Sequence, residues 1–366
     1  MSQLPVKRLF GAVIILASVI AAYLYSLIMR RFFPHGGFLL PADLECFRAN
    51  GAYLGRHIAD TVAMTNQVCV FKYPPTFLLL AVPLSWLPPL PDFILWSLVS
   101  VMFLVLTGRV LGLGWRGIGL ALLAPPVMLC LTIGQNGIFL SLALLFALVW
   151  AEGAPLAAGA IAGLLVAKPQ LGLLLPICYL AARNWRAFGA AAASSVLLCL
   201  LSAALFGTGV WRDYLLHGAA VSSQALNAPW PQNYQHILVS PFILVRAWGG
   251  DMHAAYTVQI LSSLAAAVAA WRLWSAPRPH PARLALTLCL AALITPYSYL
   301  YDLPALSLAL VALAAQTGWR RLGVLAWFWS FTSLYIFVAT FFVPLGAPCV
   351  ALMLPALWRR SAGDMP

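Results

Sequence analysis

Two acidic side chains, Asp43 and Glu45, stand in a polar stretch that follows the first long apolar run of the sequence. A carboxylate at the edge of an apolar segment can act as a general base or bind a sugar hydroxyl. The same two residues can equally be solvated loop charges that pair with Arg48. Asp43 is therefore a candidate catalytic base, and Glu45 is a candidate supporting acid.

Basic residues in similar positions can bind an anionic group such as a phosphate. Lys168 stands between two apolar runs, where an ammonium group is costly without an anionic partner. The alternative is that its side chain extends to the lipid head groups. The further candidate phosphate ligands are Arg48, Arg56, Lys72, Arg212 and Arg246.

Amide and aromatic side chains suit sugar hydroxyls and the C–H faces of sugar rings. Gln135 and Asn136 lie in Gly134-Gln135-Asn136-Gly137, which either binds a sugar or is a polar turn between two helices. Asp302 is a second candidate acid at the start of an apolar run, where a charge favoured by the helix dipole is the alternative. The other candidate sugar or acceptor ligands are Tyr73, Gln232, Asn233, His236 and Tyr301, although interfacial aromatic residues occur in any membrane protein.

The elements that must position these residues are membrane helices. Hydrophobic residues make up 63% of the 366 residues, only 8% are charged, and the mean hydropathy is +0.92. A soluble domain carries about 25% charged residues. We therefore expect an all-α polytopic membrane protein with about twelve transmembrane helices, within a range of about 10 to 13. The predicted spans are 9–29, 93–110, 116–133, 137–151, 154–167, 169–182, 187–206, 253–274, 283–296, 299–316, 322–341 and 343–358.

The charge distribution predicts the orientation of these spans. With both termini cytoplasmic, the arginine pairs gather on the inner side and seven of the nine acids lie outside. The apolar stretch near 76–88 is short and flanked by prolines, so we expect a re-entrant or surface helix there. The result is a single membrane domain, 1–366, in the plasma (inner) membrane, with outer segments at 30–92 and 207–252.

Several other functions are disfavoured. The net charge of +12 comes from basic residues between spans, which topology explains better than a nucleic-acid partner. The chain has no phosphate-binding glycine loop and no dinucleotide fingerprint, which disfavours a nucleotide-sugar donor. The six histidines lack zinc-ligand spacing, and Asp43 with Glu45 is a thin oxygen shell for a divalent cation, so we predict no required metal or cofactor. Cys46 and Cys69 share an outer segment, where a disulfide is an open possibility.

Several weak motifs in a fixed order resemble the GT-C class of polyprenyl-phosphate-sugar glycosyltransferases, and within it glycosyltransferase family 87. They are Asp43-Leu44 with Phe47 and Tyr53-Leu54-Gly55, Tyr73-Pro74-Pro75 with Pro83, Gly134-Gln135-Asn136-Gly137, Lys168-Pro169-Gln170, Thr295-Pro296-Tyr297-Ser298 and Tyr301-Asp302. The resemblance covers most of the chain. Leu44 departs from it, because the family usually has an aromatic residue after the acid.

The resemblance implies a reaction and its participants. A hexose such as mannose would move from a polyprenyl-phosphate donor to an acceptor hydroxyl on a lipid or glycan, on the extracytoplasmic side and with inversion. Asp43 matches the family's general base. The alternatives are a transporter or flippase of a lipid-linked or polar substrate, and a non-catalytic scaffold. A transporter would place ionisable residues at the bilayer midplane, whereas in the predicted topology nearly all acids lie outside the bilayer or at helix ends.

Overall fold

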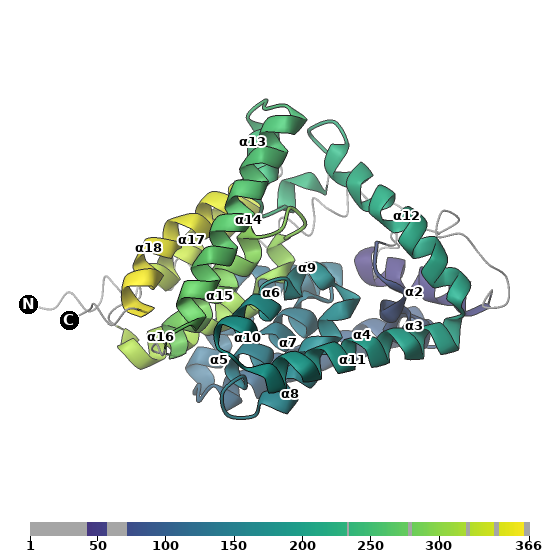
Figure 1. The fold of residues 1–366 in the computed structure, drawn as a ribbon, viewed down its shortest axis with the longest axis horizontal. Helices are drawn as coiled ribbons and strands as arrows, with labels where there is room; N and C mark the ends of the chain where they lie inside the picture. Colours follow the sequence, from purple (N-terminus) through teal and green to yellow (C-terminus); the bar gives the residue numbers. More distant parts are fainter. Residues whose placement is uncertain are drawn as a thin grey trace, which may run out of the picture.

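The computed structural model describes residues 42–56, 72–232, 234–276, 280–319, 323–339 and 344–361. This part of the chain consists of helices and contains no strand, apart from one isolated bridge between Leu238 and Tyr299 (Figure 1). The all-helical prediction is therefore confirmed for the described residues. The helices are α2 (Ala42–Arg56), η2 (Pro75–Phe77), α3 (Leu78–Leu84), α4 (Pro89–Val110), α5 (Trp115–Leu122), α6 (Pro125–Ile133), α7 (Gly137–Val149), α8 (Pro155–Ala162), η3 (Gly163–Ala167), α9 (Pro169–Gly172), α10 (Leu175–Ala181), α11 (Trp185–Phe206), α12 (Thr208–Asn227), η4 (Gln235–Ile237), α13 (Pro241–Ala247), α14 (Met252–Trp274), α15 (His280–Leu293), η5 (Leu300–Asp302), α16 (Pro304–Thr317), α17 (Gly323–Ala339) and α18 (Gly346–Ser361).

Within the described ranges, three helices, α4, α11 and α14, are long and apolar enough to cross a bilayer. The pair α5 and α6, bent by 58°, makes a fourth candidate if it is one broken span. These helices support a membrane protein, whereas the full set of about twelve spans is not established by helix length. The predicted first span, 9–29, lies outside the described residues.

Prolines explain why several predicted spans occur as shorter pieces. The predicted spans 154–167 and 169–182 form α8, η3, α9 and α10, and helices begin at Pro155 and Pro169. Proline lacks the N–H group that a helix interior needs, and it pushes the preceding residue out of the helical region. The predicted helix near 76–88 appears as α3, whose seven residues are too short to cross a membrane.

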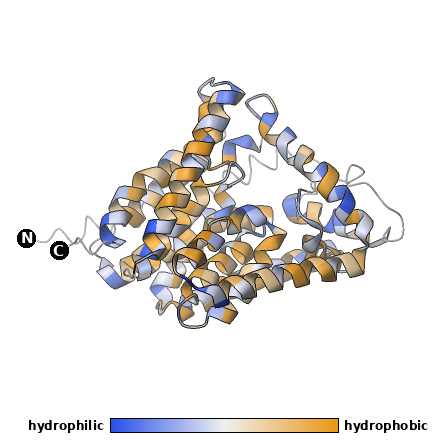
Figure 2. Ribbon diagram, viewed as in Figure 1, coloured by the Kyte–Doolittle hydropathy of each residue, from blue (hydrophilic) through white to orange (hydrophobic). Residues whose placement is uncertain are grey.

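Exposure separates the lipid-facing helices from the interior ones. In α11, Val196, Leu197 and Leu200 are each more than half exposed, and Figure 2 shows this helix as largely hydrophobic. Every residue of α16 from Pro304 to Ala314 is buried. A helix that is apolar on all sides belongs in the interior of a membrane bundle, whereas exposed leucines on α11 suit contact with hydrocarbon.

Candidate active site

Helix α2 presents Asp43 in its first turn, and aromatic packing fixes the position of the helix. Leu44 and Phe47 are buried against Phe77 of η2 and Trp96 of α4. The Phe47 and Phe77 rings meet edge to face with centroids 5.0 Å apart. Leu44, which departs from the family pattern, thus fills the packing position beneath Asp43 without an aromatic ring.

A buried arginine ties α2 to the beginning of α4. The Arg48 Nε atom lies 2.9 Å from Asp92 Oδ2, and its Nη1 atom lies 2.7 Å from Glu45 Oε2. The Nη2 atom donates to the Leu87 carbonyl at 2.7 Å. Arg48 and Glu45 therefore hold the helix that carries Asp43, and the structure directs the Arg48 donors at protein acceptors.

The amide of Gln135 connects the Asp43 carboxylate to a second part of the chain. Gln135 hydrogen-bonds the Asp43 side chain. Its Oε1 atom accepts from the Asn136 N–H at 3.2 Å and from the Tyr73 hydroxyl at 3.4 Å. Because two donors occupy the oxygen of this amide, its NH2 group is the part that donates to Asp43.

Two glycines explain why Gln135 and Asn136 stand where they do. Gly134 ends α6 in the left-handed conformation, with φ of 70°, which is accessible to glycine without strain. A Cβ atom on Gly137 would lie 1.7 Å from the Tyr301 carbonyl oxygen. The Gly134-Gln135-Asn136-Gly137 segment is therefore a turn between α6 and α7 that packs against η5.

A buried ion pair joins Lys168 to Asp302. The Lys168 Nζ atom lies 2.5 Å from Asp302 Oδ1, with side-chain exposures of 3% and 0%. It also lies 4.8 Å from the centre of the Tyr301 ring. The other Asp302 oxygen accepts from the Tyr299 N–H at 3.2 Å. Asp302 is therefore the anionic partner that Lys168 needs.

Lys72 differs from Lys168 in its partner, which is an aromatic ring instead of a carboxylate. Its Nζ atom lies over the Tyr234 ring at 4.8 Å, and it forms no ion pair with any carboxylate in the described ranges. Desolvation lowers the pKa of Lys72, and the charge of Asp43 opposes that change. Lys72 is therefore a partly buried cation available to an anionic ligand.

The surroundings of Asp43 suit a base that works near neutral pH. Desolvation raises the pKa of Asp43 from 3.8 to about 6, while the hydrogen bond from Gln135 and the charges of Lys168 and Lys72 lower it. A general base is most effective when its pKa lies close to the working pH. Asp43 is only partly buried, so an incoming hydroxyl group can reach it.

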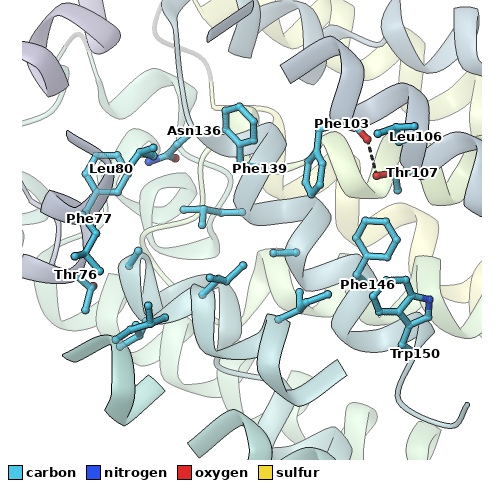
Figure 3. A pocket seen from close by; sticks show the side chains of 18 of the residues that line it. Thr76, Phe77, Leu80, Phe103, Leu106, Thr107, Asn136, Phe139, Phe146 and Trp150 are labelled. Atoms are coloured by element: carbon cyan, nitrogen blue, oxygen red, sulfur yellow. Dashed lines mark hydrogen bonds between the residues drawn. The ribbon is translucent and has the colours of Figure 1, made fainter. Parts of the chain in front are cut away.

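An apolar groove of about 670 Å³ begins beside this cluster. It runs from Thr76, Phe77 and Asn136 at one end to Phe146 and Trp150 at the other (Figure 3). Thr107, one of its few polar lining residues, donates its hydroxyl to the Phe103 carbonyl at 2.7 Å. Apart from the polar end that Thr76 and Asn136 line, the groove is therefore mainly hydrocarbon.

The groove follows one face of α7 and opens towards the lipid-facing surface. Its α7 residues fall at positions 139, 140, 143 and 146, which lie on one face of a helix. Leu80, Leu106 and Leu164 on its lining are each at least 40% exposed. A long hydrocarbon chain can therefore enter it from the side.

Apart from Arg56, the last residue of α2, the remaining predicted ligands lie in the segment from α12 to α13. Gln232 is half-buried and donates to the Pro229 carbonyl at 3.0 Å, and Asn233 lies outside the described residues. His236 is buried in η4, and its desolvation lowers its pKa to about 4, so the ring is neutral at neutral pH. Arg246 donates to the Gly250 carbonyl at 3.3 Å near the end of α13.

Some features of this site are absent from the sequence-based prediction. The groove combines residues from α3, α4, α7, α8 and α11, and no sequence spacing reveals such a combination. The stacking of Tyr299 on Tyr301, with centroids 4.9 Å apart, was also not predicted. The alternation Tyr297-Ser298-Tyr299-Leu300-Tyr301 was the available signal for it.

A metal site does not stand out among the described residues, where no three histidine, cysteine or acidic side chains converge. Asp43 and Glu45 also differ in surroundings, because Glu45 is paired with Arg48.

Cys46 lies in α2, but Cys69 lies outside the described residues, so the possible disulfide between them is not described.

A family comparison adds to this geometry. The model of glycosyltransferase family 87 matches residues 71–296, which is more than half of the chain. No curated protein and no solved structure matches. The match includes Lys72, Gln135 and Lys168, whereas Asp43 and Asp302 lie outside it. The chain belongs to glycosyltransferase family 87 and is a glycosyltransferase, as its sequence motifs predicted.

Proposed function

We propose that this enzyme moves a hexose, with mannose as the expected sugar, from a polyprenyl-phosphate donor to an acceptor hydroxyl, with inversion. The observation that carries the proposal is the position of Asp43. Its carboxylate contacts the Gln135 amide and lies near the polar end of an apolar groove. The positive charges of Lys72 and Lys168 stabilise its ionised form. Transfer from a lipid-phosphate donor requires a base for the acceptor proton, a cation for the leaving phosphate and an apolar site for the lipid chain.

The reaction needs one proton acceptor and one leaving-group partner. The acceptor hydroxyl transfers its proton to Asp43 as its oxygen bonds to C1 of the sugar. The bond between C1 and the phosphate oxygen breaks, and the polyprenyl phosphate leaves with one additional negative charge. Lys72 lies where it can offset that charge, because no described carboxylate is paired with it.

Lys168 has a positioning role in this scheme. Asp302 already balances its charge at 2.5 Å, so the pair contributes a local dipole and a fixed shape more than a free cation. The pair holds Tyr301 and the Gly137 turn together. Through that turn it fixes the position of Gln135, which contacts the base.

The groove is the proposed site for the polyprenyl chain of the donor. Asn136 and Ala167 line its polar end, and they are the sequence neighbours of Gln135 and Lys168. A donor phosphate at Lys72 can therefore continue into the groove as hydrocarbon. An apolar cavity in contact with lipid binds such a chain without desolvating polar groups.

The proposed orientation follows the positive-inside rule. It places both termini in the cytoplasm of a cell with the enzyme in its plasma (inner) membrane, and it places Asp43 on the extracytoplasmic side. About twelve spans complete this topology. A lipid or glycan supplies the acceptor hydroxyl, and we propose that no divalent cation is needed.

The decisive experiment is sugar transfer by the purified full-length protein in lipid. Polyprenyl-phosphate mannose is the radiolabelled donor, a membrane extract supplies acceptors, and wild type is compared with Asp43→Asn. We expect the variant to lose about 10²- to 10⁴-fold in rate, because the amide cannot accept the proton. It should keep its unfolding temperature, since an uncharged group suits a desolvated position.

Two controls make the result decisive. Added EDTA should leave the wild-type rate unchanged. Equal transfer by wild type and Asp43→Asn would contradict Asp43 as the base, and a lack of transfer by wild type with this donor would contradict the proposed donor.

A further inference from the structure

A second recess lies away from Asp43 and plays no part in the proposed reaction. It has a volume of about 1340 Å³ and is bordered by the ends of α7, α10, α11, α14 and the helix α15. In contrast to the apolar groove, its lining combines charged and aromatic side chains. The ones that matter here are Glu152, Arg183, Trp185, Trp271, Trp274 and Arg283.

Helix α11 shows that this recess and Asp43 lie at opposite ends of the bundle. Trp185, the first residue of α11, lines the recess, whereas Phe206, its last residue, packs in the cluster that contains Leu44 and Phe47. The 22 residues of this helix rise about 33 Å at about 1.5 Å per residue, close to the thickness of the hydrocarbon core. The recess therefore opens at the membrane surface opposite the site of transfer.

Positive charge predominates in the recess. Arg283 is 3% exposed, its Nη2 atom lies 2.5 Å from Glu152 Oε1, and its guanidinium carbon lies 4.4 Å from the centre of the Trp274 ring. Its Nε atom is buried and has no hydrogen-bond partner in the described part of the chain. Arg183 lines the same recess and is exposed, and no other acid lines it. Two guanidinium groups thus face one carboxylate, and one buried donor awaits an acceptor.

The aromatic residues point to a lipid as the source of that acceptor. Trp185 is 65% exposed and Trp271 is 49% exposed, and both lie at the ends of helices long enough to span a bilayer. Tryptophan favours the depth at which lipid head groups meet the acyl chains. Basic pockets between helix ends at that depth suit anionic head groups.

We propose that this recess binds the phosphate of an anionic phospholipid in the leaflet opposite the active site. Arg183 and the Arg283 Nε atom donate to the phosphate oxygens, and Trp185 and Trp271 flank the glycerol region. The lipid then bridges the ends of α11 and α14. This site is independent of the donor groove and of the proposed sugar transfer.

Replacing Glu152 should change the lipid affinity in a direction that distinguishes a lipid site from a structural ion pair. Glu152 is 63% exposed and competes with the phosphate for Arg283. Replacing it with glutamine removes a negative charge from the site and should strengthen lipid binding. A merely structural ion pair predicts the reverse, because its loss would loosen the recess.

The test is a titration of the delipidated full-length protein in neutral detergent, with thermal unfolding as the readout. Phosphatidylglycerol is compared with phosphatidylcholine and with inorganic phosphate. We expect phosphatidylglycerol alone to raise the unfolding temperature. Arg183→Gln should increase its half-saturating concentration about tenfold, and Glu152→Gln should lower it severalfold. Arg116→Gln, an exposed arginine of α5 outside the recess, is the matched control and should have no effect.

Each other outcome overturns the proposal. Equal effects of Arg183→Gln and Arg116→Gln would show general surface attraction. Equal protection by phosphatidylcholine would show a site without charge selectivity, and equal protection by inorganic phosphate would show an ion site without a lipid. If Arg183→Gln does not fold, weaker binding by Glu152→Gln is sufficient to reject the assignment.

Discussion

Asp43 and Asp302 are both acids at the start of a helical segment, but the fold surrounds them differently. The Asp302 side chain is fully buried, lies 2.5 Å from Lys168 Nζ and accepts the Tyr299 N–H. Asp43 is partly exposed, and its direct partner is the neutral amide of Gln135. One carboxylate is thus neutralised by the fold, and the other is left available for a proton.

The two lysines show the same contrast. Lys168 has its carboxylate within the protein, whereas Lys72 contacts the face of the Tyr234 ring. A buried charge pair holds elements together, and a single desolvated charge gains most from a ligand of opposite sign. We therefore assign Asp302 and Lys168 to positioning, and Asp43 and Lys72 to the reaction.

Breaking the buried pair should give the largest effect on stability. Asp302→Asn and Lys168→Met should each lower the free energy of unfolding by about 3–5 kcal/mol, because each removes one charge of the pair and leaves the other buried without a partner. The double variant should lose much less than the sum of the two. Thermal or denaturant unfolding of the four proteins forms the double-mutant cycle that measures this coupling.

The control for this cycle is Asp43→Asn, which should unfold like wild type while losing activity. Additive losses for Lys168→Met and Asp302→Asn would contradict the assigned pairing. A large loss of stability in Asp43→Asn would remove the distinction between the two acids.

Replacing Lys72 should have the next largest effect, on catalysis instead of stability. Lys72→Gln should lower kcat/KM for the donor by about 10- to 100-fold, because the charge that offsets the leaving phosphate is removed. Lys72→Arg keeps the charge and should retain most of the activity. If Lys72→Arg and Lys72→Gln were equally impaired, the shape of the side chain would matter more than its charge.

The sequence predicted the classes of residue at this site better than their partners. Asp43, Gln135, Asn136 and Tyr73 were selected separately, and the structure brings them together. The residue type, the edge of an apolar run and a polar interruption of such a run are all local signals. They identify residues that differ from an ordinary membrane span, and the residues selected in this way lie together in the structure.

Pairings across long separations could not be predicted in this way. Lys168 was favoured as a phosphate ligand because a lysine near a membrane needs an anion, yet Asp302, 134 positions away, supplies that anion. Arg48 was another candidate ligand, and its donors face Asp92, Glu45 and Leu87. The observed bounds of some helices also differ from the predicted ones. The prediction used the membrane thickness, which a buried helix such as α16 need not match.

Narrowing the groove should have a smaller effect that depends on the donor chain. Leu140→Trp adds volume to a partly buried lining position and should raise KM for a long-chain donor by up to about tenfold. A donor analogue with a very short prenyl chain should be affected less. Leu197→Trp, on the exposed face of α11, is the matched control and should behave like wild type. Equal KM changes for long and short donors would place the chain elsewhere.

The smallest predicted effect is on the pH dependence of the rate, and it tests whether Asp43 is the group that titrates. Its pKa of about 6 means that the active, ionised form predominates above pH 6, so kcat/KM should rise with pH and then level off. Between pH 8 and pH 6 the rate should fall only about twofold, since half of the carboxylate is still ionised at its pKa. The Gln135 hydrogen bond lowers this pKa, so Gln135→Leu should move the midpoint to higher pH. A midpoint that stayed in place or moved to lower pH in this variant would assign the titration to another group and would remove the main physical distinction between Asp43 and Asp302.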